Sequence, residues 1–239
     1  MSDQTFFDRA KFILDQFDPA RTRKTRVPRP FMVELCGTSN SGKTTLLDKL
    51  YIQLKADGFE FAKCPEGAEA VPPPRVLPVY NFRTADYALE RARAFALDKN
   101  IHVVMFDRAI FDAAVRMEKF CAAGLMTQPE RDVETAHYLN RWNRDLFDLH
   151  VCLVTDPDTA LTRRYGPDHA TTARYSTTTN PKSMQAELDA HVLTWDRLDC
   201  TNDPKMFWRD TSSETPEQTF GAVIGAVLAA FERRLATAG

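Results

Sequence analysis

One segment of eight residues, Gly37 to Thr44, constrains what this chain of 239 residues can fold into more than any other. It reads Gly-Thr-Ser-Asn-Ser-Gly-Lys-Thr, which is a complete G-x-x-x-x-G-K-T motif. An apolar run over residues 31–36 precedes it, and leucines at helical spacing follow it over residues 43–56. This order of strand, glycine loop and helix predicts a P-loop, in which backbone N–H groups at the start of a helix bind phosphate.

The residue types inside the loop predict how it would bind a nucleoside triphosphate. The glycines permit the turn and let phosphate approach the backbone. Lys43 is expected to reach the β- and γ-phosphates and Thr44 to ligate magnesium, so ATP and Mg²⁺ are the predicted cofactors. The predicted nucleotide-binding residues are Gly37, Thr38, Ser39, Asn40, Ser41, Gly42, Lys43, Thr44 and Thr45, together with Arg174 from a later segment.

Strand-like runs alternate with helical patterns along the rest of the chain. The runs lie at residues 31–36, 59–63, 101–106, 150–155 and 206–209. Alternation of this kind predicts an α/β fold, a parallel five-stranded sheet with helices on both faces. With 44% apolar and 27% charged residues, the chain has the composition of a soluble globular domain and not of a disordered one.

Four further expectations concern the segments between the strands. Residues 65–78 are rich in proline, so we expect a loop without regular structure. A helix is expected from Thr84, as its N-cap, to Leu97, and a single helix over residues 129–147. Residues 166–180 are rich in threonine and poor in apolar residues, which predicts a mobile loop.

A second candidate for chemistry is the pair Asp107-Arg108, which follows the third strand-like run. Ligands on parallel sheets lie at the carboxyl ends of the strands, so this pair, the P-loop and Asp156 should converge. A carboxylate at this place can hold magnesium or its water, and the arginine can neutralise charge on a transferred phosphoryl group. An Asp-Arg pair taken alone favours a structural ion pair, but its place after this strand in a P-loop protein favours the functional interpretation.

Arginines around the threonine-rich segment form the third candidate group. Arg163 and Arg164 precede the segment, and Arg174 lies within it. Cationic residues on a segment that closes over substrate suit phosphoryl transfer, because they complete the site only when substrate is bound. The alternative is that the first two complement the dipole at the C-terminus of a helix.

Residues 21–29 carry five basic side chains. The net charge of −2 gives no global attraction to nucleic acid, so any such partner would need a local basic patch of this kind. The stretch is therefore either a solvated linker or a clamp on phosphates or nucleic acid.

Cysteines and apolar segments predict the compartment. The five cysteines include no CxxC pair, which favours free thiols and a cytoplasmic location. The N-terminus lacks the apolar run of a signal peptide, and the apolar stretch at residues 220–231 is too short to span a bilayer. We therefore expect no membrane association.

The order of P-loop, Asp-Arg after a strand, and arginines beside a later loop resembles the thymidylate kinase and deoxynucleoside kinase superfamily. Residues 106–112, Phe-Asp-Arg-Ala-Ile-Phe-Asp, are similar to the Asp/Glu-Arg motif of that family, and residues 154–164 to its strand–proline–helix approach to a lid. The resemblance covers most of the chain. It implies a P-loop kinase domain over residues 31–239 with a lid at about 164–182, preceded by an N-terminal helix and basic linker over residues 1–30.

Carried over residue by residue, the resemblance implies that Asp107 assists magnesium and that Arg108 contacts the phosphates of donor and acceptor. Arg163 or Arg164 would act from the lid. The family also places a carboxylate after its second strand, where it touches the acceptor and can serve as base, and Glu66 is the candidate here. The candidate catalytic residues are therefore Lys43, Glu66, Asp107, Arg108, Arg163 and Arg164, with Thr44 and Asp107 as metal ligands.

The acceptor is less defined by the sequence than the reaction. Arg91 or Arg93 could bind an acceptor phosphate, as in a thymidylate-kinase-like enzyme, or could be solvent-facing helix residues. The family's arginine-rich lid pattern is diluted at residues 171–176, and residues 71–80 carry no recognisable acceptor signature.

Three functions follow from these features. The leading one is a kinase that moves the γ-phosphoryl group of ATP to a nucleoside or nucleotide. A second keeps the chemistry but acts on a base hydroxyl within DNA or on a nucleic-acid end, with residues 21–29 as the contact. A third is a regulatory nucleotide-switch ATPase, although the sequence after Asp107 lacks the glycine of an Asp-x-x-Gly switch and no Asn-Lys-x-Asp guanine reader is present. Formation of a homodimer is left open.

Overall fold

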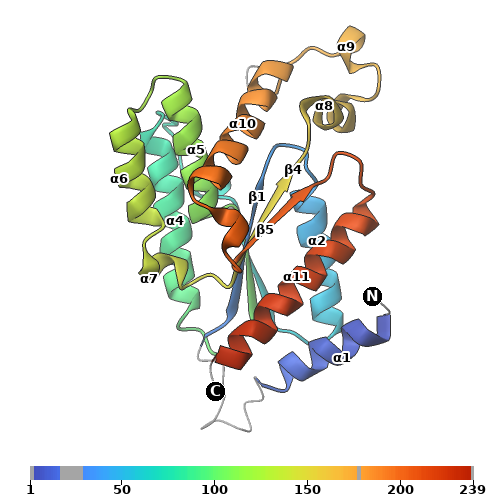
Figure 1. Cartoon of the computed structure of the whole chain (residues 1–239). Coiled ribbons are helices and arrows are strands. Elements are labelled where there is room, and N and C mark those ends of the chain that lie inside the picture. Colours follow the sequence, from blue (N-terminus) through green and yellow to red (C-terminus); the bar gives the residue numbers. More distant parts are fainter. Residues whose placement is uncertain (1–2, 17–28, 177–178, 238–239) are drawn as a thin grey trace.

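The computed structural model describes residues 3–16, 29–176 and 179–237. Its centre is a five-stranded sheet in the order β2-β3-β1-β4-β5, in which every neighbouring pair is parallel (Figure 1). The predicted parallel α/β sheet is confirmed, and each strand lies within two residues of its expected position. The strands are β1 (Phe31–Gly37), β2 (Phe61–Cys64), β3 (Val103–Asp107), β4 (Leu149–Val154) and β5 (Met206–Asp210).

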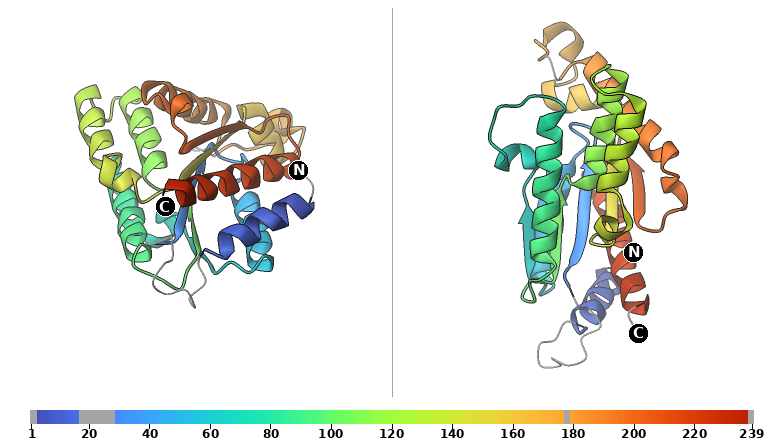
Figure 2. Two further views of the ribbon diagram at one scale, coloured as in Figure 1. Left: turned by 60° about the horizontal axis from the view of Figure 1, so that its bottom comes forward. Right: turned by 90° about the vertical axis from the view of Figure 1, so that its left-hand side faces the viewer.

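Helices cover both faces of the sheet (Figures 1 and 2). One face carries α1 (Asp3–Leu14), α2 (Lys43–Ala56) and α11 (Pro216–Thr237). On the other side lie α4 (Val79–Phe95), α5 (Ile110–Ala122), α6 (Gln128–Tyr138) and α10 (Pro181–Arg197). Shorter elements connect them: α3 (Gly67–Ala70), α7 (Arg141–Arg144), α8 (Pro157–Tyr165), α9 (His169–Thr172) and the 3₁₀ turn η2 (Cys200–Asn202).

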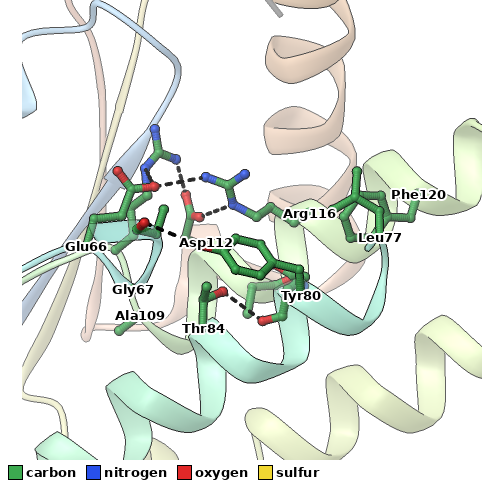
Figure 3. A pocket seen from close by; sticks show the side chains of 13 residues that line it. Glu66, Gly67, Leu77, Tyr80, Thr84, Ala109, Asp112, Arg116 and Phe120 are labelled. Atoms are coloured by element: carbon green, nitrogen blue, oxygen red, sulfur yellow. Dashed lines mark hydrogen bonds and ion pairs between the residues drawn. The ribbon is translucent and has the colours of Figure 1, made fainter. Parts of the chain in front are cut away.

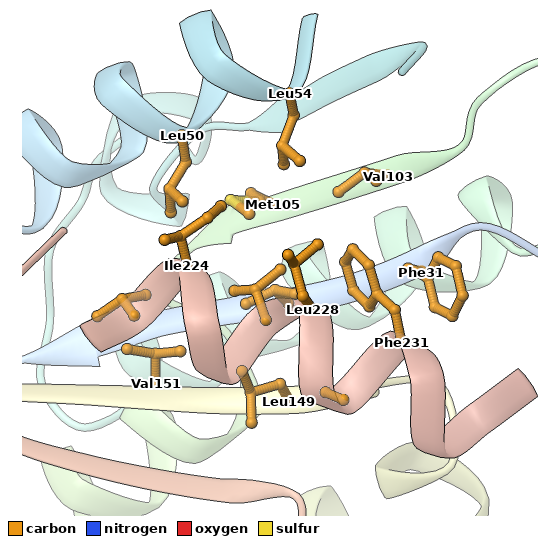
Figure 4. Packing of buried hydrophobic residues seen from close by; sticks show 14 of the residues in the cluster. Phe31, Leu50, Leu54, Val103, Met105, Leu149, Val151, Ile224, Leu228 and Phe231 are labelled. Atoms are coloured by element: carbon orange, nitrogen blue, oxygen red, sulfur yellow. The ribbon is translucent and has the colours of Figure 1, made fainter. Parts of the chain in front are cut away.

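Alternation along the strands assigns apolar side chains to the two faces. In β1, Phe31 and Val33 pack in the cluster with α2 and α11, whereas Met32 packs with α4 and α5. Figure 4 shows the first cluster, where the ring of Phe31 stacks on that of Phe231 with centroids 4.0 Å apart. Ile13 of α1 is fully buried in the same cluster, so this helix packs on the core of the domain.

Two expected helix boundaries are wrong. Helix α4 begins at Val79, after Pro78, and not at Thr84. The Thr84 hydroxyl instead donates to the carbonyl of Asn81 one turn earlier, at 2.8 Å, so its side chain acts inside the helix. The single helix expected over residues 129–147 is two helices, because Asn140 accepts from the Asn143 N–H and begins α7 after α6 has ended.

Two segments expected to lack regular structure contain short helices. Helix α3 lies within the proline-rich loop, and it forms because its four residues precede the three consecutive prolines and include none. Helix α9 lies within the threonine-rich segment, where His169 is buried and its ring nitrogens lie 2.8 Å from the Tyr175 hydroxyl and 3.1 Å from Asp158. These polar contacts join α9 to α8 and to Tyr175.

Most of the basic stretch, residues 21–28, lies outside the described residues. Its last member, Arg29, donates to the Asp148 carboxylate at 2.9 and 3.1 Å, close to the start of β4. Arg234 of α11 donates to the same carboxylate at 3.0 Å. Arg29 is therefore part of a structural ion pair, at the end of the sheet opposite the P-loop, and is not a free phosphate contact.

The expectation of free thiols is confirmed. All five cysteines are free thiols, and Cys36 and Cys152 are buried in the sheet. Across the part of the chain that the structure describes, no helix is long and apolar enough to cross a membrane.

A fully buried carboxylate connects the sheet to α5. Glu34, in the middle of β1, accepts hydrogen bonds from the backbone N–H groups of Ala109, Phe111 and Asp112 at 2.7, 3.1 and 2.9 Å. Its second oxygen also lies 2.8 Å from Nδ1 of His150 in β4. Three N–H groups at the start of a helix would otherwise be buried without acceptors, so Glu34 fixes where α5 begins.

Replacing Glu34 by leucine is expected to lower the free energy of unfolding by at least about 3 kcal/mol, because each N–H group left buried and unpaired costs about 1–3 kcal/mol. The measurement is urea unfolding followed by circular dichroism. Glu60→Gln serves as the control, since that carboxylate is 63% exposed and its ion pair with Lys55 is worth less than about 1 kcal/mol. Equal midpoints for the two variants would contradict the role given to Glu34.

Candidate functional site

The P-loop has the backbone that its glycines require. Gly37 has a φ of 134°, and a Cβ there would lie 1.7 Å from the carbonyl oxygen of Leu153, so β4 passes too close for any other residue. Gly42 has a φ of 93° and is the N-cap of α2. The loop thus turns onto the N-terminus of α2, where backbone N–H groups are free to bind an anion.

Side chains of the loop attach it to neighbouring elements of the fold. Thr38 is buried, and its hydroxyl accepts from the Thr155 N–H at 2.9 Å, which fixes the loop to the end of β4. The Asn40 side chain donates to the Ala160 carbonyl of α8 at 3.2 Å. Gly37 and Thr38 therefore shape the loop. The predicted nucleotide-binding residues that line the cleft are Ser39, Asn40, Ser41, Gly42, Lys43, Thr44 and Thr45.

Lys43 folds back over the loop. Its Nζ donates to the carbonyl oxygens of Gly37 at 3.1 Å and Thr38 at 2.6 Å, and lies 3.3 Å from the Ser41 hydroxyl. Burial, assisted by the nearby charge of Arg108, lowers the pKa of Lys43 from 10.5 to about 8. An ammonium group whose hydrogen bonds all go to neutral oxygens, and which is partly deprotonated near pH 8, is suited to gain an anionic partner.

Asp107 and Arg108 reach the same cleft from β3, as the sequence predicts. The Arg108 N–H donates to the carbonyl of Leu35 at 2.9 Å, so the pair lies directly beside the strand that enters the P-loop. Burial raises the pKa of Asp107, and the charges of Arg108 and Lys43 partly offset it. Asp156 has another role, because its carboxylate accepts from the Thr159 N–H and caps α8.

The residues that could hold magnesium are Thr44 and Asp107, which line one cleft. A hydroxyl and a carboxylate are the hard oxygen ligands that Mg²⁺ prefers, with phosphate oxygens and water completing its shell. Within the described ranges, no group of three or more His, Cys, Asp or Glu side chains could bind a metal without such help. The donor set fits a metal that arrives with phosphates.

Beside the cleft lies a second pocket, between the chain around α3 and the helices α4 and α5 (Figure 3). Glu66 and Arg108 line both the cleft and the pocket. Asp112 accepts from Nη1 of Arg108 at 2.6 Å and from Nε of Arg116 at 2.8 Å. Oε1 of Glu66 lies 3.3 Å from Nε of Arg108 and 3.3 Å from Nη2 of Arg116. Carboxylates and guanidinium groups therefore alternate along this wall.

Sequence reasoning missed three residues of the site. Asp112 and Arg116 follow Arg108 at intervals of four on one helix face, a spacing that could have indicated them. Glu187 of α10 accepts from the Ser39 N–H at 3.1 Å, and its other oxygen lies 4.0 Å from Arg108. Although burial raises the pKa of Glu187, Arg108 and Lys43 hold it below its usual range. No local sequence signal connects this helix to the P-loop.

The lid arginines have different surroundings. Arg163 donates to the carbonyl of Thr211 at 2.5 Å and to the carbonyl of Asn40 at 3.3 Å, so it links the P-loop to the segment after β5. Arg164 lines the cleft, and its guanidinium lies 5.5 Å from the centroid of the Tyr165 ring, with no carboxylate ion pair among the described residues. Arg174 is exposed and does not line the cleft.

Arg91 and Arg93 do not lie in the pocket, although the sequence allowed an acceptor-binding role for them. The Arg91 guanidinium lies 4.7 Å from the Phe95 ring centroid. Arg93 donates to the Asn143 side chain at 3.1 Å. Both occupy the last turns of α4, while the pocket is lined by its first turns, so the length of the helix separates them from the site.

No protein-family model matches the chain, and no curated protein matches it. Solved structures match it clearly. Deoxyadenosine kinase from M. mycoides, with the products dCMP and a flexible dCDP bound, aligns with a TM-score of 0.57 and 13% identity, over 83% of this chain and 100% of that one. Thymidylate kinase from Candida albicans aligns with a TM-score of 0.56 and 11% identity, over 87% of this chain and 94% of that one.

At these identities the comparison establishes the fold. The chain has the fold of these P-loop nucleoside and nucleotide kinases, which confirms the predicted fold class. A second structure of the same deoxyadenosine kinase, with dCTP bound, aligns with a TM-score of 0.53 over 83% of this chain.

Lys43 makes the stability of the protein depend on pH in a defined direction. Its pKa is about 8 when folded and 10.5 as the ordinary value, so below pH 8 the folded state carries the cost of a buried charge. As the pH rises from 8 toward 10.5, the folded protein loses this proton first and is stabilised relative to the unfolded chain. Relative to Lys43→Met, the wild type should gain about 1–2 kcal/mol of unfolding free energy between pH 7.5 and 9.5. Parallel pH profiles in urea unfolding would contradict this.

Proposed function

We propose that this chain, which has the fold of nucleoside and nucleotide kinases, is a magnesium-dependent phosphotransferase that moves the γ-phosphoryl group of ATP to a nucleoside or nucleotide. One observation carries the proposal: a complete P-loop cleft and a separate pocket meet at Glu66 and Arg108, which line both. A phosphoryl donor bound in the cleft and an acceptor bound in the pocket would therefore meet beside one carboxylate and one guanidinium group.

The cleft supplies binding and charge stabilisation for the donor. N–H groups of the loop and the N-terminus of α2 bind the phosphates, and Lys43 exchanges its carbonyl partners for phosphate oxygens. Thr44 and Asp107 would hold the magnesium ion, which neutralises charge on the phosphates when bound. Glu187 accepts an N–H of this loop, and like charge would push it away from the phosphates.

The transfer step joins the two cavities. An acceptor hydroxyl oxygen forms a bond to the γ-phosphorus, the bond from that phosphorus to the β–γ bridging oxygen breaks, and ADP leaves with that electron pair. Glu66 is the carboxylate that lines both cavities, so it is the group that can take the hydroxyl proton. Arg108 has a buried Nε without a hydrogen-bond partner in the described residues, and this N–H can donate to the transferred phosphoryl group.

The test is ATP-dependent phosphate transfer to a panel of nucleosides and nucleotides. Lys43→Ala should lower turnover by about 10²-fold or more, because a cation aimed at the transferring phosphate is lost. Its circular dichroism should stay that of the wild type. Lys55→Ala, on the same helix with a side chain 40% exposed, is the matched control and should keep full activity. Near-normal turnover by folded Lys43→Ala would refute the proposal.

The two lid arginines should give different kinetic signatures. Arg164 lines the cleft without a carboxylate partner, so Arg164→Ala should lower kcat, by up to about 10³-fold, with little change in KM for ATP. Arg163 is bound to backbone carbonyls at both sides of the cleft, so Arg163→Ala should chiefly raise KM for ATP and lower Tm. Steady-state kinetics and thermal melts decide between them, and identical effects on kcat would contradict the distinction.

A further inference from the structure

The charged side chains around the pocket beside the P-loop cleft affect which acceptor that pocket can bind. The inference rests on the proposed function, because it treats this pocket as the acceptor site. The charged side chains that line the pocket are Glu66, Arg108, Asp112 and Arg116. Figure 3 shows the carboxylate of Asp112 and the side chains of Glu66 and Arg116 turned toward one another.

Each guanidinium group in this wall already has carboxylate partners. Arg108 lies 2.6 Å from Asp112, 3.3 Å from Glu66 and 4.0 Å from Glu187. Arg116 lies 2.8 Å from Asp112 and 3.3 Å from Glu66. Within the pocket two positive charges thus face two negative ones, so the wall is neutral through internal pairing before any ligand enters, and Glu187 is not among the lining residues.

Asp112 remains ionised in the folded protein. The Asp112 side chain is only 4% exposed. Burial raises its pKa, but Arg108 and Arg116 hold the pKa of Asp112 well below its usual range. The ion pairs of Asp112 therefore stay charged throughout the neutral range, and both arginines already have carboxylate partners.

Other arginines near the pocket do not supply a free cation to it. Arg75 donates to the Ala68 carbonyl at 3.3 Å, and its guanidinium lies 5.6 Å from the centroid of the Tyr80 ring. It is not among the residues that line the pocket, and neither is any arginine of α4. A phosphate monoester carries about −1.5 to −2 charges at neutral pH, and it would find both guanidinium groups of the pocket already paired with carboxylates.

The uncharged part of the wall offers a hydrogen-bond acceptor. Asn81 is 3% exposed and lines the pocket. Its Nδ2 donates to the Ala113 carbonyl at 3.3 Å, which fixes the orientation of the amide and leaves Oδ1 buried without a partner in the described residues. A buried carbonyl oxygen of this kind is satisfied by a ligand N–H or O–H group.

We propose that the acceptor is an uncharged hydroxyl compound of the nucleoside class, with an N–H donor for Asn81, and not a nucleoside monophosphate. Its hydroxyl oxygen takes the γ-phosphoryl group in the step written above, and its proton goes to Glu66. Arg108 and Arg116 then act in this pocket by holding Asp112 and Glu66 in place, rather than by binding an acceptor phosphate.

Calorimetric binding and transfer assays should compare the four deoxynucleosides with their 5′-monophosphates, in the presence of magnesium and ATP or a non-hydrolysable analogue. At least one nucleoside should bind, and be phosphorylated, at least about tenfold better than its monophosphate. Tighter binding or faster transfer with the monophosphate would overturn the inference while the phosphotransferase proposal stands. Absence of transfer to every compound would refute the phosphotransferase proposal, and the binding data would still decide the charge preference. Absence of binding by all of them overturns the inference.

Charge variants test whether the charged side chains of the pocket cause the preference for a nucleoside over its monophosphate. Asp112→Asn removes one negative charge from the wall, so monophosphate affinity relative to the nucleoside should rise by about tenfold. Asp132→Asn is the matched control, since this carboxylate pairs with Arg131 and Arg197 and does not line the pocket. Glu66→Gln gives the same test by binding alone if Asp112→Asn is unfolded. An unchanged ratio in folded variants would overturn the inference, and so would loss of monophosphate binding in Arg75→Ala.

Discussion

The carboxylate of Glu34 accepts three backbone N–H groups at the start of α5, and the geometry of both cavities depends on that contact. Helix α5 carries Asp112 and Arg116, and Arg108 lies immediately before it with a φ of 63°. A non-glycine residue with such a φ is uncommon and needs support from its surroundings. The sheet provides this support, because Glu34 accepts the N–H of Ala109, the residue after Arg108. Glu34 belongs to the same strand that leads into the P-loop.

Charge balance then decides how the site accommodates its ligands. Without phosphates, Lys43 is held by loop carbonyls and Arg108 by carboxylates, since a buried cation needs partners of some kind. The two kinds of partner have different effects on ligand binding. Neutral carbonyls are readily exchanged for an anion, whereas the paired carboxylates of the pocket keep their arginines occupied. One fold thereby places a cleft that can bind an anion next to a pocket whose charged side chains are paired with one another.

Much of this arrangement could be predicted from the sequence where the signal is local. The P-loop, its strand and its helix follow from residues 31–56, and Asp107 and Arg108 were expected at the end of β3, where they lie. Predictions failed where local propensity was the only guide. Thr84 resembles a helix N-cap but lies within α4, because the buried residue Asn81 in the turn before it contacts Ala113 of α5 and the helix begins earlier.

What the sequence by itself determined is the phosphate-binding loop, because its glycines, lysine and threonine act through backbone geometry and contacts between near neighbours. Only the tertiary structure decided the role of Glu187, which is 148 residues from Ser39 yet accepts its N–H, and the partners of Asp112 and Arg116. The physical reason is that a side chain's charge acts over a few ångströms in space. Residues that lie far apart along the chain give no sequence signal that they are close in space. The packing of α10 and α5 against the P-loop brings them together.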